Sequence, residues 1–154
     1  MGFPLVTEQD QNKVRYLVRD SEQVAKTARN LSERFAQLFG QDHPKEYWGV
    51  TFVPEGTGES ASLTCPFGIA RVTTTIHVGN DGVFGRYIVE RSVKNIDGAD
   101  SWRAVWLVRI SKDGVVYTQE EGGEPIEIRD SYPGSSNNDI GRLGLSMLYS
   151  IGAN

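Results

Sequence analysis

The sequence is poor in the residues that usually carry metal and redox chemistry. It contains one cysteine, Cys65, and two histidines, His43 and His77. One cysteine excludes an intrachain disulfide and any metal cluster built on several cysteines, and it favours a reducing compartment. Two histidines without H-E-x-x-H spacing fall short of the three protein ligands of a typical catalytic zinc ion. We therefore expect no metal site and no cofactor, and the sequence assigns no catalytic residues.

Long hydrophobic runs are also missing. The longest mostly apolar stretch, residues 140–153, includes an arginine and is too short to span a bilayer. The opening residues MGFPLVTEQD show neither the charged start nor the apolar core of a secretory signal, and Val6 stands where a myristoylation motif needs Ser or Thr. These features predict a cytoplasmic protein that does not enter membranes.

Composition and charge predict one globular domain over residues 1–154. Apolar residues make up 38% of the chain and charged residues 23%, which is ordinary for a domain of this size. The formal net charge is −4, and the whole excess of acidic groups lies in residues 112–154. A chain with this balance is a poor binder of polyanions, so we expect no nucleic-acid partner.

Residues 7–39 are predicted to form a helix. Thr7 and Asp10 resemble a capping box, and Gly40 follows the last apolar residue as a terminating glycine does. Apolar and small residues recur at spacings of three and four and form one stripe. Its members are Val14, Leu17, Ser21, Val24, Ala28, Leu31, Phe35 and Leu38.

The length of this helix poses a problem, because at 1.5 Å per residue it would be about 50 Å long, more than the diameter of a small domain. A second N-cap at Asp20 or Ser21 would break it into two helices. Alternatively, the stripe over residues 14–38 would pair with a second copy and form a homodimer. Small residues at Ser21 and Ala28 weaken such a seam, so packing on the protein's own sheet is favoured.

Residues 45–130 are predicted to form an antiparallel meander, because alternating apolar residues are separated by glycine-containing turns. The expected strands are 46–53, 67–78, 84–94, 102–111 and 114–120, with a short sixth near 126–129. Residues 54–66, rich in Gly, Ser and Pro, are expected to form a loop. A short C-terminal helix is expected over residues 138–152. The predicted fold is therefore α+β in two layers, with both helices on one face of a five- or six-stranded sheet.

Strict alternation in strand 102–111 would place Trp102 and Trp106 on one face and Arg103 and Arg109 on the other. The tryptophans share their face with the larger apolar set. We therefore expect both rings in the core, beneath the N-terminal helix and against Leu31, Phe35 and Leu38.

The same alternation gathers a basic, partly apolar surface on the opposite face. Its expected members are Arg71, Arg86, Arg103, Arg109 and His77. Such a surface would bind an acidic or anionic partner, because arginine favours bidentate contacts. The alternative is an ordinary solvated sheet face whose arginines pair with the acidic segment 120–130.

Three classes of function are compatible with these features. The favoured class is a non-enzymatic module that binds another protein with an acidic surface, such as an inhibitor, an immunity or antitoxin-type protein, or a chaperone. The alternative is a small-molecule binder with a pocket between helix and curved sheet. That pocket would be lined by Trp102, Trp106, Tyr87 and Phe35. An enzyme using His77 or His43 with a carboxylate or Cys65 ranks last.

Overall fold

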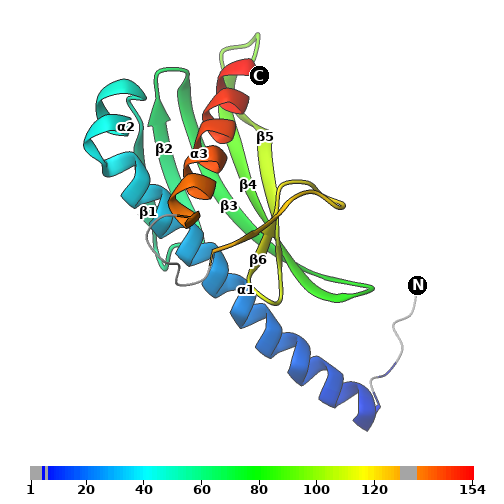
Figure 1. Ribbon diagram of the computed structural model, residues 1–154. Coiled ribbons are helices and arrows are strands. Elements are labelled where there is room, and N and C mark those ends of the chain that lie inside the picture. The colour runs from blue at the N-terminus through cyan, green and yellow to red at the C-terminus, as the bar shows by residue number, and fades with distance from the viewer. Residues whose placement is uncertain (1–4, 6, 129–134) are drawn as a thin grey trace.

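The computed structural model describes Leu5, residues 7–128 and residues 135–154 (Figure 1). The chain forms a two-layer α+β fold, in which helices cover one face of a curled antiparallel sheet (Figure 1). The helices are α1 (Glu8–Gly40), α2 (Asp42–Tyr47) and α3 (Ser135–Ala153). The strands are β1 (Thr51–Glu55), β2 (Ser60–Cys65), β3 (Gly68–Gly79), β4 (Gly82–Lys94), β5 (Asp100–Ser111), β6 (Val115–Tyr117) and β7 (Pro125–Glu127).

The sheet is a meander in which strands β1 to β7 lie side by side in chain order. It has seven strands instead of five or six, because residues 60–65 form β2 within the expected loop 54–66. Ala61, Leu63 and Cys65 of β2 are buried, whereas the residues between them are not. The alternation is real, but small residues carry it weakly, which is why composition alone predicts a loop.

Two expected strand boundaries were wrong. The first strand starts at Thr51 and not at residue 46, because Asp42–Tyr47 form the short helix α2. The strand expected at 114–120 is limited to β6, after which the chain turns away from β5. The last predicted strand, near 126–129, corresponds to β7, and residue 129 lies outside the described residues.

Helix α1 is unbroken from Glu8 to Gly40. Its start is a full capping box, in which the Thr7 hydroxyl accepts from the Asp10 N–H and the Asp10 carboxylate accepts from the Thr7 N–H. The predicted break near residue 20 was wrong, because the Ser21 hydroxyl donates to the Val18 carbonyl within the same helix. Gly40 is the last helical residue, not a left-handed cap, and Gln41 ends the helix in an extended conformation.

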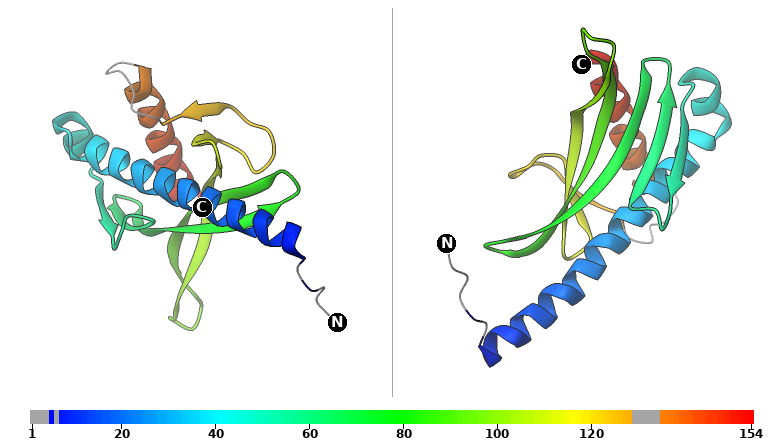
Figure 2. Two further views of the ribbon diagram at one scale, coloured as in Figure 1. Left: turned by 90° about the horizontal axis from the view of Figure 1, so that it is seen from below. Right: turned by 180° about the vertical axis from the view of Figure 1, so that it is seen from behind.

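Helices α1 and α3 pack on the same face of the sheet and against each other, as the views from two sides show (Figure 2). The core lies between these helices and the sheet and is centred on Phe35, Tyr87 and Met147. Close packing of α3 on α1 requires Gly144, since a Cβ there would lie 2.9 Å from Leu38 Cδ2. This contact provides the docking surface that a glycine-containing helix needs.

The length of α1 is accommodated because the N-terminal half of the helix projects beyond the sheet. Its buried residues begin at Val24, and the preceding turns extend past the sheet into solvent (Figure 1). In the part of the chain that the structure describes, no helix combines the length and apolar character needed to cross a membrane.

Candidate protein-binding face

The face of the sheet opposite α1 and α3, which we call the open face, has no described helix over it (Figure 2). Its composition follows from strand register, because residues directly opposite each other on neighbouring strands point to the same side. Its central members are Arg71, Thr73, Thr75 and His77 of β3, Phe84, Arg86, Ile88 and Glu90 of β4, Trp102, Leu107 and Arg109 of β5, and Tyr117 of β6.

A β-bulge in β5 decides which side chains reach this face. Val89 pairs with Trp106, but the next residue, Glu90, pairs with Ala104, so Val105 is an extra residue in β5. Such an insertion reverses the inward and outward alternation on one side of it. Residues of β5 before Val105 therefore face opposite to what strict alternation predicts.

The expectation that both tryptophans lie in the core was wrong for Trp102. Trp106 lies on the helix-covered side, where its ring contacts Phe35 and its indole N–H donates to Ser146 Oγ at 3.1 Å. Trp102 pairs with Ser92 on the open face and is 38% exposed. The two rings are on opposite faces of one strand.

Arg103 is reversed for the same reason, so its predicted place on the basic face was wrong. It pairs with Arg91, whose guanidinium donates to the carbonyl of Ile151 in α3 and therefore lies on the helix-covered side. The exposed Arg103 points to that side as well. Arg71, Arg86, Arg109 and His77 do share the open face.

Arg71 and Trp102 form one cluster on the open face. The Arg71 guanidinium lies 4.1 Å from the centroid of the Trp102 ring, and its Nε donates to Glu90 Oε1 at 3.1 Å. The carboxylate and the ring hold the guanidinium from two sides, so these two contacts define its orientation.

A second cluster lies nearer the β3–β4 turn. Arg86 and Arg109 are directly opposite each other on β4 and β5, and the Arg109 guanidinium lies 4.3 Å from the centroid of the Tyr117 ring. Glu120, from the acidic loop after β6, forms an ion pair with Arg86. Arg109 Nε is buried and has no hydrogen-bond partner within the described residues. Of these two adjacent cations, Glu120 therefore pairs with Arg86.

Apolar side chains connect the two clusters. Ile88 and Leu107 are paired at the centre of the open face and are half-buried. Toward β1, Val53 and Ile69 are 49% and 56% exposed, and their register places them on the same face. The open face thus combines an apolar centre with arginine and aromatic groups at both ends.

The residues proposed for acid–base or thiol chemistry are placed separately. His77 lies on the open face, hydrogen-bonded to Thr75 and stacked on Phe84 with ring centroids 5.3 Å apart. His43 packs on Tyr47 in α2, and the buried Cys65 donates to the Gly68 carbonyl. Among the described residues, no group of three or more His, Cys, Asp or Glu side chains is arranged to hold a metal ion.

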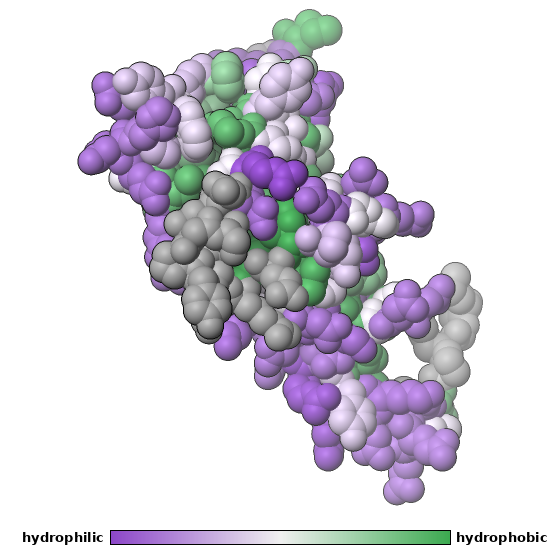
Figure 3. Space-filling view, viewed as in Figure 1, coloured by the Kyte–Doolittle hydropathy of each residue, from purple (hydrophilic) through white to green (hydrophobic). Residues whose placement is uncertain are grey.

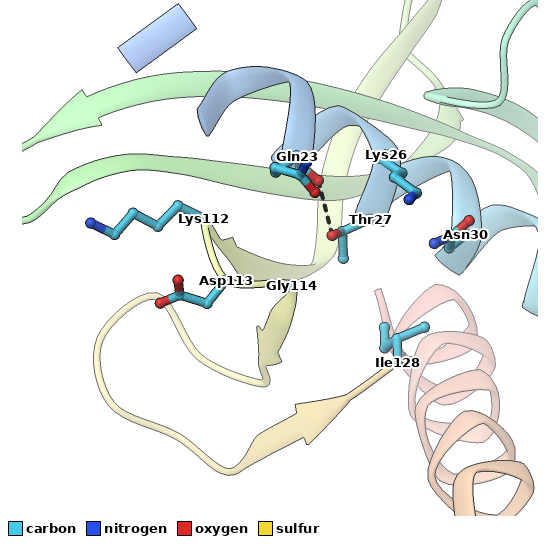
Figure 4. A pocket seen from close by; sticks show the side chains of 8 residues that line it. All are labelled: Gln23, Lys26, Thr27, Asn30, Lys112, Asp113, Gly114 and Ile128. Carbon is cyan, nitrogen blue, oxygen red and sulfur yellow. Dashed lines mark hydrogen bonds between the residues drawn. The ribbon is translucent and has the colours of Figure 1, made fainter. Parts of the chain in front are cut away.

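Three of the four residues expected to line a small-molecule pocket contact one another in the core. Phe35 packs on Tyr87 and on Trp106 with centroid separations of 6.2 and 6.3 Å, while Trp102 lies on the other face. A separate hollow of about 500 Å³ lies between α1 and the β5–β6 turn (Figure 4). Its lining is polar, unlike an aromatic pocket, and comprises Gln23, Lys26, Thr27, Asn30, Lys112, Asp113, Gly114 and Ile128.

Sequence reasoning missed Trp102 and Tyr117 as members of this surface, although alternation does place Ile88 and Leu107 on it. The bulge has no local signal, because Ala104, Val105 and Trp106 all fit a regular strand. The pairing of Arg86 with Glu120 agrees in part with the alternative that arginines pair with the acidic segment.

Comparison of the chain with protein-family models, curated proteins and solved structures finds no match.

Proposed function

We propose that this protein is a non-enzymatic, cytoplasmic module that binds another protein through the open face. The observation that carries the proposal is the pair of arginine–aromatic stacks, Arg71 on Trp102 and Arg109 on Tyr117, on a sheet face without a described helix over it. Between them lie the half-buried aliphatic side chains of Ile88 and Leu107. The class includes inhibitors, immunity or antitoxin-type proteins and dedicated chaperones.

The residue types on this face favour protein binding. Tryptophan, tyrosine and arginine are the residues that most often contribute a large share of interface binding energy. Here Glu90 and Trp102 already orient Arg71 in the free protein, which reduces the entropy that binding would otherwise lose. Exposed aliphatic groups such as Ile69 gain most from being covered by a partner.

The charge of the face favours an acidic partner. Three arginines lie on it, and Glu90 and Glu120 pair with two of them. Arg109 stands opposite Arg86, a pairing of like charges that costs free energy in the free protein, and among the described residues its buried Nε has no hydrogen-bond partner. A partner carboxylate near the Arg109 guanidinium would reduce the repulsion between the two arginines.

The test is capture of the partner from native lysate, followed by measurement of its affinity for purified variants. Trp102→Ala should weaken binding about 30-fold or more, since hot-spot truncations cost ~2 kcal/mol or more. Arg109→Glu should weaken it comparably by placing a carboxylate against the acidic partner. Circular dichroism would verify that both variants fold.

Arg103→Glu is the matched control, because it makes the same charge change six residues earlier on the same strand but on the helix-covered side. Tyr149→Ala, on α3 and 78% exposed, controls for loss of an exposed ring. Both should bind like the wild type. A partner that binds the Trp102 and Arg109 variants as well as the wild type would overturn the proposal.

A further inference from the structure

The projecting half of α1, residues 8–23, carries apolar side chains that no described part of the chain covers. Val14 and Val18 are 47% and 55% exposed, and Leu17 is half-buried. They continue the stripe that is buried from Val24 onward, where Leu31 and Phe35 are fully buried. In the space-filling view this half of α1 stands away from the body as a largely hydrophilic arm (Figure 3).

The neighbouring end of the sheet is apolar on the same side. Ile76 and Val78 of β3 pair with Gly85 and Val83, whose side lies against α1. Ile76 is 42% exposed and Val78 is 67% exposed. The exposed end of the sheet therefore lies on the side that faces α1.

An isolated helical segment of this length is marginally stable in water, and the capping box at Thr7 satisfies only its first turn. Val14, Leu17 and Val18 would be stabilised by a second apolar helix face. We propose that residues 8–23 pair in antiparallel orientation with the same residues of a second copy of this chain. This interface is separate from the open face.

The spacing of the stripe sets the alignment of the two helices. With Val14 opposite Leu17 of the second copy, Leu17 faces Val14 of that copy, and Asp10 faces Ser21. The helices then overlap over about 24 Å, at 1.5 Å per residue. A parallel alignment would place Asp10 against Asp10, so the antiparallel one is favoured.

Charge complementarity supports pairing with a second copy of this chain. Lys13 and Asp20 are seven residues apart and lie on the same flank of the stripe. The antiparallel alignment brings Lys13 beside Asp20 of the second copy, and twofold symmetry makes this pair twice. Among the described residues of one chain, the ion pairs of these two groups are long, 3.8 Å from Lys13 to Asp10 and 3.9 Å from Asp20 to Arg19.

The interface is short and contains Ser21 in place of a larger residue, so the dimer should be weak and depend on protein concentration. Sedimentation velocity of the purified full chain over a wide concentration range measures this equilibrium. We expect a reversible monomer–dimer transition that weakens at high salt.

A charge swap tests the alignment. Lys13→Glu and Asp20→Lys should each weaken dimerisation about tenfold, because each places like charges side by side twice. The double variant K13E/D20K restores opposite charges and should return the dissociation constant to within about threefold of the wild type. Arg15→Glu, which makes the same charge change on the opposite flank of the stripe, away from the Lys13–Asp20 pair, is the matched control and should have little effect.

Val14→Asp tests the apolar contact and should abolish the dimer while leaving the melting temperature nearly unchanged, since Val14 is outside the core. A wild-type chain that stays monomeric at every concentration would overturn the proposal. So would a dimer that is insensitive to these changes, or a double variant no better than the single ones. Trp102→Ala should leave dimerisation unchanged, which separates this proposal from binding at the open face.

Discussion

The hydroxyl oxygen of Tyr87 lies 2.7 Å from Oγ of Ser32, in a core that is otherwise built from apolar side chains. Ser32 is on α1 and Tyr87 on β4, and neither is accessible to solvent. Apolar contacts alone tolerate small sliding of a helix on a sheet. This hydrogen bond has one geometry and so defines the position of α1 along the sheet.

Removal of one partner of this hydrogen bond should destabilise the fold. Ser32→Ala leaves the Tyr87 hydroxyl buried without a partner and should cost about 1 to 3 kcal/mol in the free energy of unfolding. Replacing both residues, in S32A/Y87F, should cost less than the sum of the single changes. Urea denaturation measures all three variants, and strictly additive effects would mean that the bond contributes nothing.

The same tyrosine predicts a loss of stability in alkali. Burial raises the pKa of the Tyr87 hydroxyl well above its usual value near 10. The unfolded chain then releases this proton at lower pH than the folded chain does. The contribution of the protonated Tyr87 hydroxyl to the free energy of unfolding is therefore complete below pH ~10 and is lost as the pH rises beyond it. The loss approaches about 1.4 kcal/mol per pH unit for one proton.

Tyr87→Phe removes this ionisation and is the control for the alkaline effect. Urea unfolding of both proteins between neutral and strongly alkaline pH should show a shallower decline for the variant. Parallel curves would show that Tyr87 ionises equally in both states.

Gly85 of β4 is predicted to be intolerant of a side chain. A Cβ at this position would lie 2.5 Å from Val24 Cγ1, where α1 crosses the sheet. Gly85→Ala should therefore destabilise the protein by about 1 to 3 kcal/mol through overpacking. Adding Val24→Ala should recover part of the loss by making room, and thermal unfolding would detect both effects.

The two tryptophans of β5 should respond differently to truncation. Trp106→Ala removes the contact with Phe35 and the hydrogen bond to Ser146, and should cost about 3 kcal/mol. Trp102→Ala removes a partly exposed ring and should cost about 1 kcal/mol or less. Equal losses in denaturant melts would contradict the reversal of faces at the bulge.

Arg91 is expected to hold the end of α3 in place. Its guanidinium donates to the carbonyls of Ile151 and Phe67, joining the last turn of α3 to the β2–β3 turn. Arg91→Met keeps most of the side-chain volume but loses both hydrogen bonds, and should cost about 1 to 3 kcal/mol. Amide hydrogen exchange should accelerate in the last turn of α3.

Arg103→Met is the control for this effect, because Arg103 is directly opposite Arg91 but exposed. It should leave exchange in α3 unchanged. Similar acceleration in both variants would assign the effect to loss of charge rather than to the two hydrogen bonds.

Local patterns were sufficient to predict most elements of this fold, although they missed α2 and β2. Alternating spacings of three and four predict α1, and Thr7 with Asp10 predicts its start, because these signals act within a few residues of the chain. Period-two alternation between glycine turns likewise predicts the antiparallel meander, and the excess of strands before the C-terminal helix predicts two layers. The presence of Arg71, Arg86, Arg109 and His77 on one face follows from the same alternation.

Only the tertiary structure decided which face Trp102 and Arg103 occupy and where α1 leaves the sheet. The extra residue at Val105 is accommodated by pairing with β4, a contact between segments that the local sequence does not encode. The burial of α1 from Val24 onward depends on where the sheet ends, although the apolar stripe continues to Val14 without a break. The sequence by itself determines the periodicity of each element, whereas contacts between distant elements determine which apolar residues are covered and which remain exposed.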